Sequence, residues 1–70
     1  MQRREVDALC KIAWDDGVVE VLVWLEGSWR GRTYPLDLDL LLRLGRTGFE
    51  SRMVDRFLAD WSRRDESAAA

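Results

Sequence analysis

Histidine is missing from this 70-residue sequence, and cysteine and proline each occur once, as Cys10 and Pro35. A protein zinc site needs several histidine or thiolate ligands, and the common catalytic triads and dyads need a histidine beside the nucleophile. The sequence therefore excludes both kinds of site, and it excludes an internal disulfide. A single cysteine is typical of a protein of the reducing cytoplasm, which is where we expect this chain.

Phosphate-binding glycine motifs are missing as well. The five glycines form neither a G-x-x-x-x-G-K-[ST] loop nor a G-x-G-x-x-G turn, so nucleotide binding has no support. The carboxylate pairs Asp15/Asp16 and Asp37/Asp39 have plainer roles, the first in a turn and the second in a helix cap. We therefore expect no enzyme activity, no cofactor and no metal. No apolar run has the length of a signal peptide or a membrane span, so we expect no membrane association.

The overall composition is typical of a small globular domain. Hydrophobic residues make up 47% of the chain, charged residues make up 34%, and the net charge is -2. Such values lie inside the range of folded proteins, and so weak a charge does not indicate a nucleic-acid or membrane coat. We expect one domain over residues 1–64 and a frayed tail over residues 65–70.

Residues 6–25 have the pattern of a β-hairpin. Two runs rich in β-branched and aromatic residues flank Asp15-Asp16-Gly17, which is a strong turn signal. A two-residue turn at Asp16-Gly17 pairs Trp14 with Val19, whereas a three-residue turn would bury Glu20 and is rejected. The two-residue turn gives one wholly apolar face, made of Ala8, Cys10, Ile12, Trp14, Val19, Val21, Val23 and Leu25.

A third, shorter strand is expected from Trp29 to Tyr34, after a turn at Glu26-Gly27-Ser28. Pro35 ends this strand because it has no backbone donor. A connection with an odd number of residues is preferred, because an even number would turn Arg30 and Arg32 toward the apolar side of the sheet. The outer face of the sheet then carries Leu9, Leu22, Trp24, Arg30, Arg32 and Tyr34.

Two helices are expected after the strands. The first runs from about Asp37, which can cap its first turn, to Leu44, with Gly45 as a left-handed stop, although residues 36–40 also fit a strand. Thr47-Gly48-Phe49-Glu50 matches a capping box and opens the second helix. The apolar positions of this helix recur at spacings of three and four: Phe49, Met53, Val54, Phe57, Leu58 and Trp61. The sequence thus predicts an α+β fold, a three-stranded antiparallel β-meander packed against two C-terminal α-helices.

Two apolar surfaces exceed what a lone domain of this size can bury. The outer sheet face combines Leu, Trp, Tyr and Arg, which favours a protein-binding surface, although arginine stems could instead simply cover it. The leucines of residues 36–44 favour pairing as a homodimer. The predicted partner-binding residues are Leu22, Trp24, Trp29, Arg30, Arg32 and Tyr34, and the predicted dimer contacts are Leu38, Leu41 and Leu42.

A nucleic-acid partner is possible but less favoured. Arg52, Arg56 and Arg63 lie close together on the outer side of the predicted second helix and are candidate phosphate contacts. Asp55 and Asp60 lie between them, however, and favour an ordinary solvated helix face.

The order of elements from Trp29 to Arg64 resembles the latter half of ribbon-helix-helix repressors, with Leu44-Gly45-Arg46-Thr47 preceding an amphipathic helix. The resemblance implies that Arg30, Arg32 and Tyr34 read DNA. It does not extend to the preceding hairpin or to the length of the first helix.

The function that these features favour is that of a small non-enzymatic protein-binding module. We expect a bacterial or phage-type accessory regulator or inhibitor that docks on a larger protein. Inhibitors of host immunity such as anti-CRISPR proteins have this size and lack catalytic groups. The alternative is a DNA-binding regulator with a ribbon-helix-helix-like C-terminal half.

Overall fold

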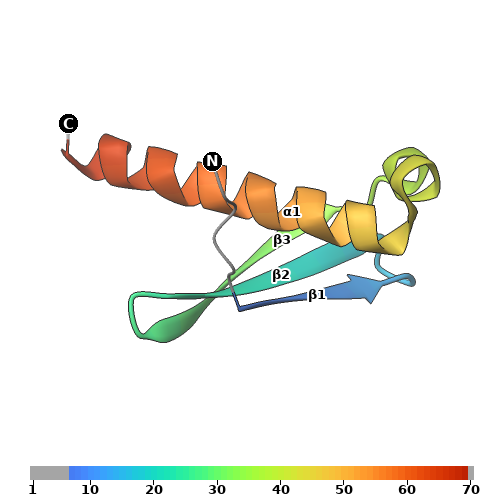
Figure 1. Ribbon diagram of the computed structural model, residues 1–70, viewed down its shortest axis with the longest axis horizontal. Helices are drawn as coiled ribbons and strands as arrows, with labels where there is room; N and C mark the ends of the chain where they lie inside the picture. The colour runs from blue at the N-terminus through green and yellow to red at the C-terminus, as the bar shows by residue number, and fades with distance from the viewer. Residues whose placement is uncertain (1–6, 70) are drawn as a thin grey trace. The chain divides into compact units, whose positions relative to one another are not determined.

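The computed structural model describes residues 7–69, and the side chains of residues 7–63. The elements in chain order are β1 (Ala8–Ala13), β2 (Val18–Leu25), β3 (Ser28–Pro35) and α1 (Leu38–Ala69) (Figure 1). The strands form one antiparallel sheet in the order β1-β2-β3, so the α+β class and the three-stranded meander are confirmed. The chain divides into two compact units between Leu36 and Asp37, and the assignment of residues 1–64 to one domain stays a prediction.

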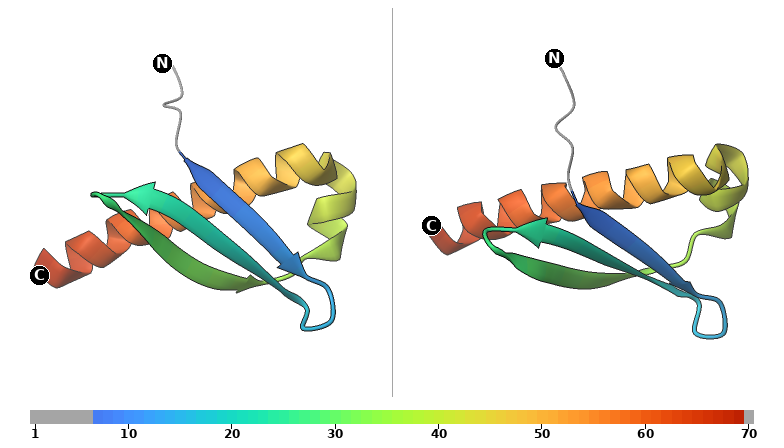
Figure 2. Two further views of the ribbon diagram at one scale, coloured as in Figure 1. Left: turned by 90° about the horizontal axis from the view of Figure 1, so that it is seen from below. Right: turned by 60° about the horizontal axis from the view of Figure 1, so that its bottom comes forward.

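The connection between β1 and β2 is a four-residue loop, so the predicted two-residue turn is wrong. Figure 2 shows this loop between β1 and β2. Ala13 pairs with Val18, and hydrogen bonds from Asp16 N to Ala13 O (3.2 Å) and from Gly17 N to Trp14 O (3.3 Å) close the loop. A two-residue turn of the favoured type needs positive φ at both of its residues. Here Gly17 has a φ of 66°, whereas Asp16 keeps an ordinary negative φ.

The longer loop shifts the pairing of β1 with β2 by two residues, which leaves the residues of these two strands on their predicted faces. Ile12 pairs with Val19 instead of Val21, and the side chains of β2 still alternate between the two sides of the sheet. Val19, Val21 and Val23 are 0% exposed, so the prediction that the valines face inward is confirmed. Trp14 leaves the strand for the loop, so its predicted place on the apolar face is wrong. Val6, where the hairpin was predicted to begin, lies outside the described residues.

The turn between β2 and β3 has two residues, Glu26 and Gly27, so the odd-numbered connection was wrong. Their φ angles are 52° and 83°, and positive φ at both positions is the requirement of a type I′ turn. The turn pairs Leu25 with Ser28 and Trp24 with Trp29. Each side chain of β3 therefore lies on the opposite side of the sheet from the one predicted.

Glu26→Asn is expected to raise the free energy of unfolding by about 0.5–1 kcal/mol. A left-handed backbone is unfavourable for glutamate, whereas asparagine tolerates it and is preferred in type I′ turns. Urea unfolding followed by circular dichroism measures the change. Glu26→Gln is the matched control, because it removes the same charge without easing the backbone. An equal gain in both variants would assign the effect to charge and contradict the backbone explanation.

The start of α1 is capped as predicted. The Asp37 side chain accepts a hydrogen bond at Oδ1 from Leu40 N (3.0 Å), and its carbonyl oxygen accepts one from Leu41 N (3.0 Å). These bonds satisfy backbone donors that would otherwise lack partners in the first helical turn. Because α1 begins at Leu38, residues 38–40 are helical, which decides between the strand and helix readings of this segment.

Gly45 interrupts α1, but the structure has one helical element where two were predicted. Gly45 has a φ of 75° and a ψ of 171°, so the predicted need for glycine with positive φ is confirmed, but the ψ angle lies outside the predicted left-handed helical region. Figure 1 shows the helix changing direction there. No loop separates the two segments, because helical backbone resumes directly after this glycine. Thr47 consequently lies inside the helix, and the predicted start at a Thr47 capping box is wrong.

The long segment of α1 buries the predicted apolar face. Phe49, Met53 and Phe57 are buried, and the rings of Phe57 and Trp61 are stacked with centroids 6.4 Å apart. The helix extends to Ala69, and the frayed tail over residues 65–70 stays a prediction. Ala70 lies outside the described residues.

Candidate interaction surface

One side of the sheet carries a contiguous group of apolar side chains that are open to solvent. Strand pairing places Leu9 beside Leu22 and Trp24 beside Trp29, all on the side opposite the buried valines. Leu9, Trp24 and Trp29 are exposed, with the two indoles at 45% and 47%, and Leu22 is half-buried. We call the group Leu9, Leu22, Trp24 and Trp29 the tryptophan face.

The two tryptophans hold each other in a defined geometry. Their ring centroids are 5.6 Å apart, and the planes meet at 79°, which is the edge-to-face arrangement favoured by the charge distribution of aromatic rings. They form the second residue pair from the Glu26-Gly27 turn, which fixes their register. The pair is therefore pre-ordered for contact with another molecule while both rings stay partly exposed.

Gly31 shapes the tryptophan face by having no side chain. It lies opposite Leu22, and a Cβ atom at this position would come within 2.8 Å of Leu22 Cδ2. Leu22 therefore extends over the backbone of β3, into space that any other residue would occupy. Gly31 was not among the predicted site residues. Its position inside a predicted strand could have revealed it, because glycine there often marks a close approach to the backbone.

Polar residues border the tryptophan face on the same side of the sheet. Lys11 pairs with Glu20, and Glu20 pairs with Thr33, toward the four-residue loop. An apolar centre beside a polar margin is the usual composition of a protein–protein interface.

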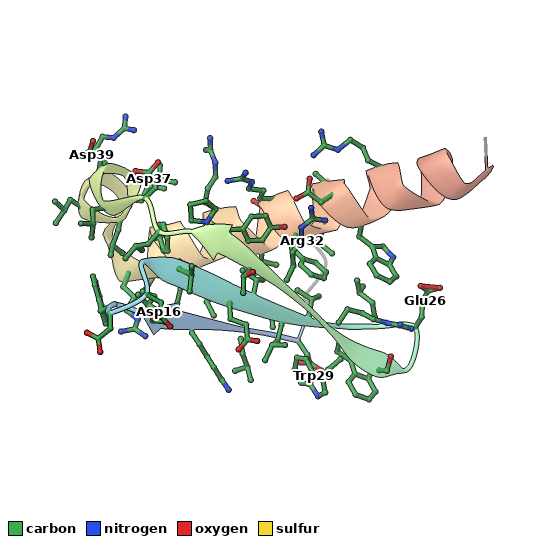
Figure 3. All side chains as sticks on the ribbon, turned by 180° about the vertical axis from the view of Figure 1, so that it is seen from behind. Asp16, Glu26, Trp29, Arg32, Asp37 and Asp39 are labelled. Carbon is green, nitrogen blue, oxygen red and sulfur yellow. The ribbon has the colours of Figure 1, made fainter. Side chains whose placement is uncertain are left out.

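Arg30, Arg32 and Tyr34 lie on the other side of the sheet, so their predicted place beside Trp24 is wrong. They pair with Val23, Val21 and Val19. Figure 3 shows Trp29 and Arg32 projecting to opposite sides of β3. The stems of Arg30 and Arg32 therefore do not cover the tryptophan face.

This prediction failed because β3 is an edge strand, where an arginine beside an apolar layer need not be buried. Arg30 is half-buried, and its Nε donates to Leu25 O at 3.4 Å. Arg32 stays exposed, with its guanidinium carbon 5.8 Å from the centre of the Tyr34 ring. The stems lie along the sheet while the charged groups reach polar surroundings. Tyr34, only 4% exposed, fills the apolar layer instead.

The predicted dimer leucines lie in the first turns of α1. Leu38 and Leu42 are exposed, and Leu42 is 81% exposed, the highest value among the large hydrophobic side chains described. Leu41 is half-buried. The structure thus leaves two of these three leucines available for contact with another molecule.

The candidate phosphate contacts Arg52, Arg56 and Arg63 are exposed on α1. Arg63 forms an ion pair with Asp60, three residues earlier on the helix. Arg46 forms another with Glu50, at 3.5 Å. Ion pairs of this spacing are typical of a solvated helix face and contribute little stability.

Among the residues that the structure describes, no group of three or more histidine, cysteine, aspartate or glutamate side chains could hold a metal ion. No described helix combines the length and the apolar character needed to cross a lipid bilayer.

Comparisons with protein-family models, with curated proteins and with solved structures found nothing that matches this chain.

Proposed function

We propose that this chain is a small non-enzymatic protein-binding module that docks on a larger protein through the tryptophan face. The observation that carries the proposal is the pair of half-exposed indoles, Trp24 and Trp29, beside two leucines on one side of a sheet. Single exposed apolar residues are common on soluble proteins, whereas contiguous apolar patches usually mark contact sites. Tryptophan is also among the residues that contribute most to binding energy.

The order already present in the tryptophan face favours tight docking. The strand pairing and the Trp24–Trp29 ring contact hold the indoles in place before a partner arrives. Binding therefore loses less side-chain entropy than it would with freely rotating residues. The expected partner is a protein whose surface offers an apolar recess for the two rings.

The role that fits this surface is that of an accessory regulator or inhibitor of bacterial or phage type. Such a protein acts by occupying a partner's surface and needs no catalytic group of its own. We place it in the cytoplasm, because the single cysteine suits a reducing compartment.

The alternative, a DNA-binding regulator, has less support. In ribbon-helix-helix proteins the strand pairs with its twin in the dimer and presents alternate side chains to DNA. Here β3 pairs with β2 of the same chain, and Tyr34 is buried.

Replacement of Trp24 or Trp29 by alanine is expected to weaken the partner complex by about 30-fold, or about 2 kcal/mol, the usual effect of removing a central interface tryptophan. The immobilised chain would first capture the partner from the lysate of its source organism, and calorimetry would then measure the affinity of each purified variant.

Trp14→Ala is the matched control, because Trp14 is 59% exposed but lies in the β1–β2 loop, away from the tryptophan face. It is expected to bind as the unchanged chain does. If Trp24→Ala and Trp29→Ala also bind with unchanged affinity, the tryptophan face is not the docking surface. Duplex DNA captured with an affinity that falls steeply with salt would favour the alternative.

A further inference from the structure

Strand β3 lies at one edge of the sheet, because among the strands that the structure describes only β2 pairs with it (Figure 2). Its pairing with β2 runs from Ser28 to Pro35 without a bulge. Edge strands are commonly protected by a bulge or by proline, since their exposed backbone groups can pair with another strand. Here the proline comes only at the last residue of the strand, so most of the edge remains suitable for pairing.

The hydrogen-bond register shows which residues of β3 direct their backbone groups outward. Leu36 N donates to Gly17 O at 2.9 Å, and antiparallel pairs alternate between bonded and non-bonded ones. The residues whose N–H and C=O groups point away from β2 are therefore Trp29, Gly31 and Thr33. All three are exposed. Because glycine has no side chain, the exposed surface of Gly31 is backbone.

The side chains between these three residues determine which segment suits the edge. Arg30 and Arg32 are neighbours on one side of β3, and Arg32 is exposed. Glu20 supplies the only carboxylate of β2 and β3, and it lies on the other side of the sheet. Both arginines would form non-hydrogen-bonded pairs with an added antiparallel strand, and in such pairs the side chains come closest. An added strand is therefore favoured if its side chains opposite the arginines are acidic.

A second copy of this chain does not meet this requirement. Antiparallel pairing of two β3 strands about Arg30, Gly31 or Arg32 places an arginine of one copy opposite an arginine of the other. Like charges directly across a strand pair are unfavourable. The same charges attract a strand that carries carboxylates.

We propose that the outer edge of β3 binds an extended acidic segment of the partner protein as a fourth, antiparallel strand. This inference rests on the proposed function, because it names the part of the partner that reaches the tryptophan face. Backbone hydrogen bonds to Trp29, Gly31 and Thr33 hold the segment, as in other proteins that bind a peptide at a sheet edge. Acidic side chains at alternate positions face Arg30 and Arg32, and apolar side chains between them lie beside Trp29. The segment recognised is therefore one in which acidic and apolar residues alternate.

A short blocked peptide of alternating glutamate and valine is the probe, because every register of pairing presents acidic side chains on one side and apolar ones on the other. NMR of the full chain would follow the exchange of backbone amide hydrogens with solvent. The peptide is expected to slow exchange at least about tenfold at Trp29, Gly31 and Thr33, whose N–H groups point outward. A lysine–valine peptide is the matched control and is expected not to bind. Unchanged exchange with the acidic peptide, or equal binding of the two peptides, would overturn the proposal.

Two substitutions test the backbone pairing and the charge separately. Thr33→Pro removes an outward N–H group and is expected to abolish peptide binding, whereas Thr33→Val keeps that group and is expected to bind as the unchanged chain does. The sheet should tolerate this proline, because Pro35 already occupies an outward-facing position of the same strand. Arg32→Glu is expected to weaken peptide binding at least about tenfold, and Arg52→Glu, the same charge change on α1, is expected to have no effect. Circular dichroism establishes that each variant is folded. A folded Thr33→Pro chain that still binds the peptide would show that no strand is added.

Trp24 distinguishes the edge from the tryptophan face, because it lies on β2, away from the outer edge of β3. Trp24→Ala is expected to weaken the partner complex and to leave peptide binding unchanged, whereas Thr33→Pro is expected to weaken both. If Thr33→Pro leaves the partner complex unchanged while Trp24→Ala weakens it, the added strand is wrong and the tryptophan face remains the docking surface. If only Thr33→Pro weakens the complex, the edge alone binds the partner and the proposed function of the tryptophan face is wrong.

Discussion

Val21→Asp is expected to abolish the cooperative thermal unfolding transition and to leave the sheet unfolded at room temperature. Val21 is 0% exposed and lies in the central strand of the sheet. Burying an unpaired carboxylate costs several kcal/mol, and the lost burial of valine adds about 1.5–3 kcal/mol. A domain of this length has a total stability of only about 4–10 kcal/mol, so the substitution removes most or all of it.

Circular dichroism during heating measures this effect. Thr33→Asp is the matched control, since it places the same residue at an exposed position of β3 on the opposite side of the sheet. The control is expected to reduce stability by only about 1 kcal/mol, because aspartate is a poor strand former and would lie opposite Glu20. If Val21→Asp melts at the temperature of the control, the valine side of the sheet is not the apolar interior.

Gly45→Val is expected to reduce the stability of the fold by about 3 kcal/mol. The backbone of Gly45, with a φ of 75° and a ψ of 171°, lies in a region that only glycine enters readily, and a branched side chain makes it more unfavourable still. For a domain of this size the loss corresponds to a melting temperature lower by roughly 10–25 °C.

Thr47→Val separates the backbone effect from the ordinary cost of valine in a helix. Thr47 is exposed, lies two residues away and has helical backbone angles, so its replacement by valine is expected to be close to neutral. Equal melting temperatures for the two valine variants would show that the direction change at Gly45 does not need glycine.

The strand could be recognised from the sequence because valine occupies every second position from Val19 to Val23. An even shift of the β1–β2 pairing leaves the same β1 side chains on the side of Val19, Val21 and Val23, so the apolar face was predicted correctly although the loop length was not. Asp15-Asp16-Gly17 suits turns of two or four residues equally, and the choice depends on the φ angle of Asp16. The spacing of residues along the sequence does not determine that φ angle.

The candidate site was predicted only in part. The side of the sheet assigned to each β3 side chain was chosen by assuming that arginines avoid the interior. That rule holds for central strands but not for an edge strand, where Arg30 and Arg32 can keep their stems on the apolar side. Trp29 therefore joined Trp24 on the exposed side, while Tyr34 moved to the buried one. The two-residue turn at Glu26-Gly27 decides on which side each β3 side chain lies, and a glutamate with positive φ is too unusual to expect from sequence alone.

The short connections of the sheet also influence how the chain folds. Each strand pairs only with its neighbour in the sequence, through links of four and two residues. Closing such short links costs little chain entropy, and folding is faster when contacting residues are close in sequence. Both hairpins can therefore form soon after synthesis, which shortens the time during which unpaired strands could join those of other chains and aggregate.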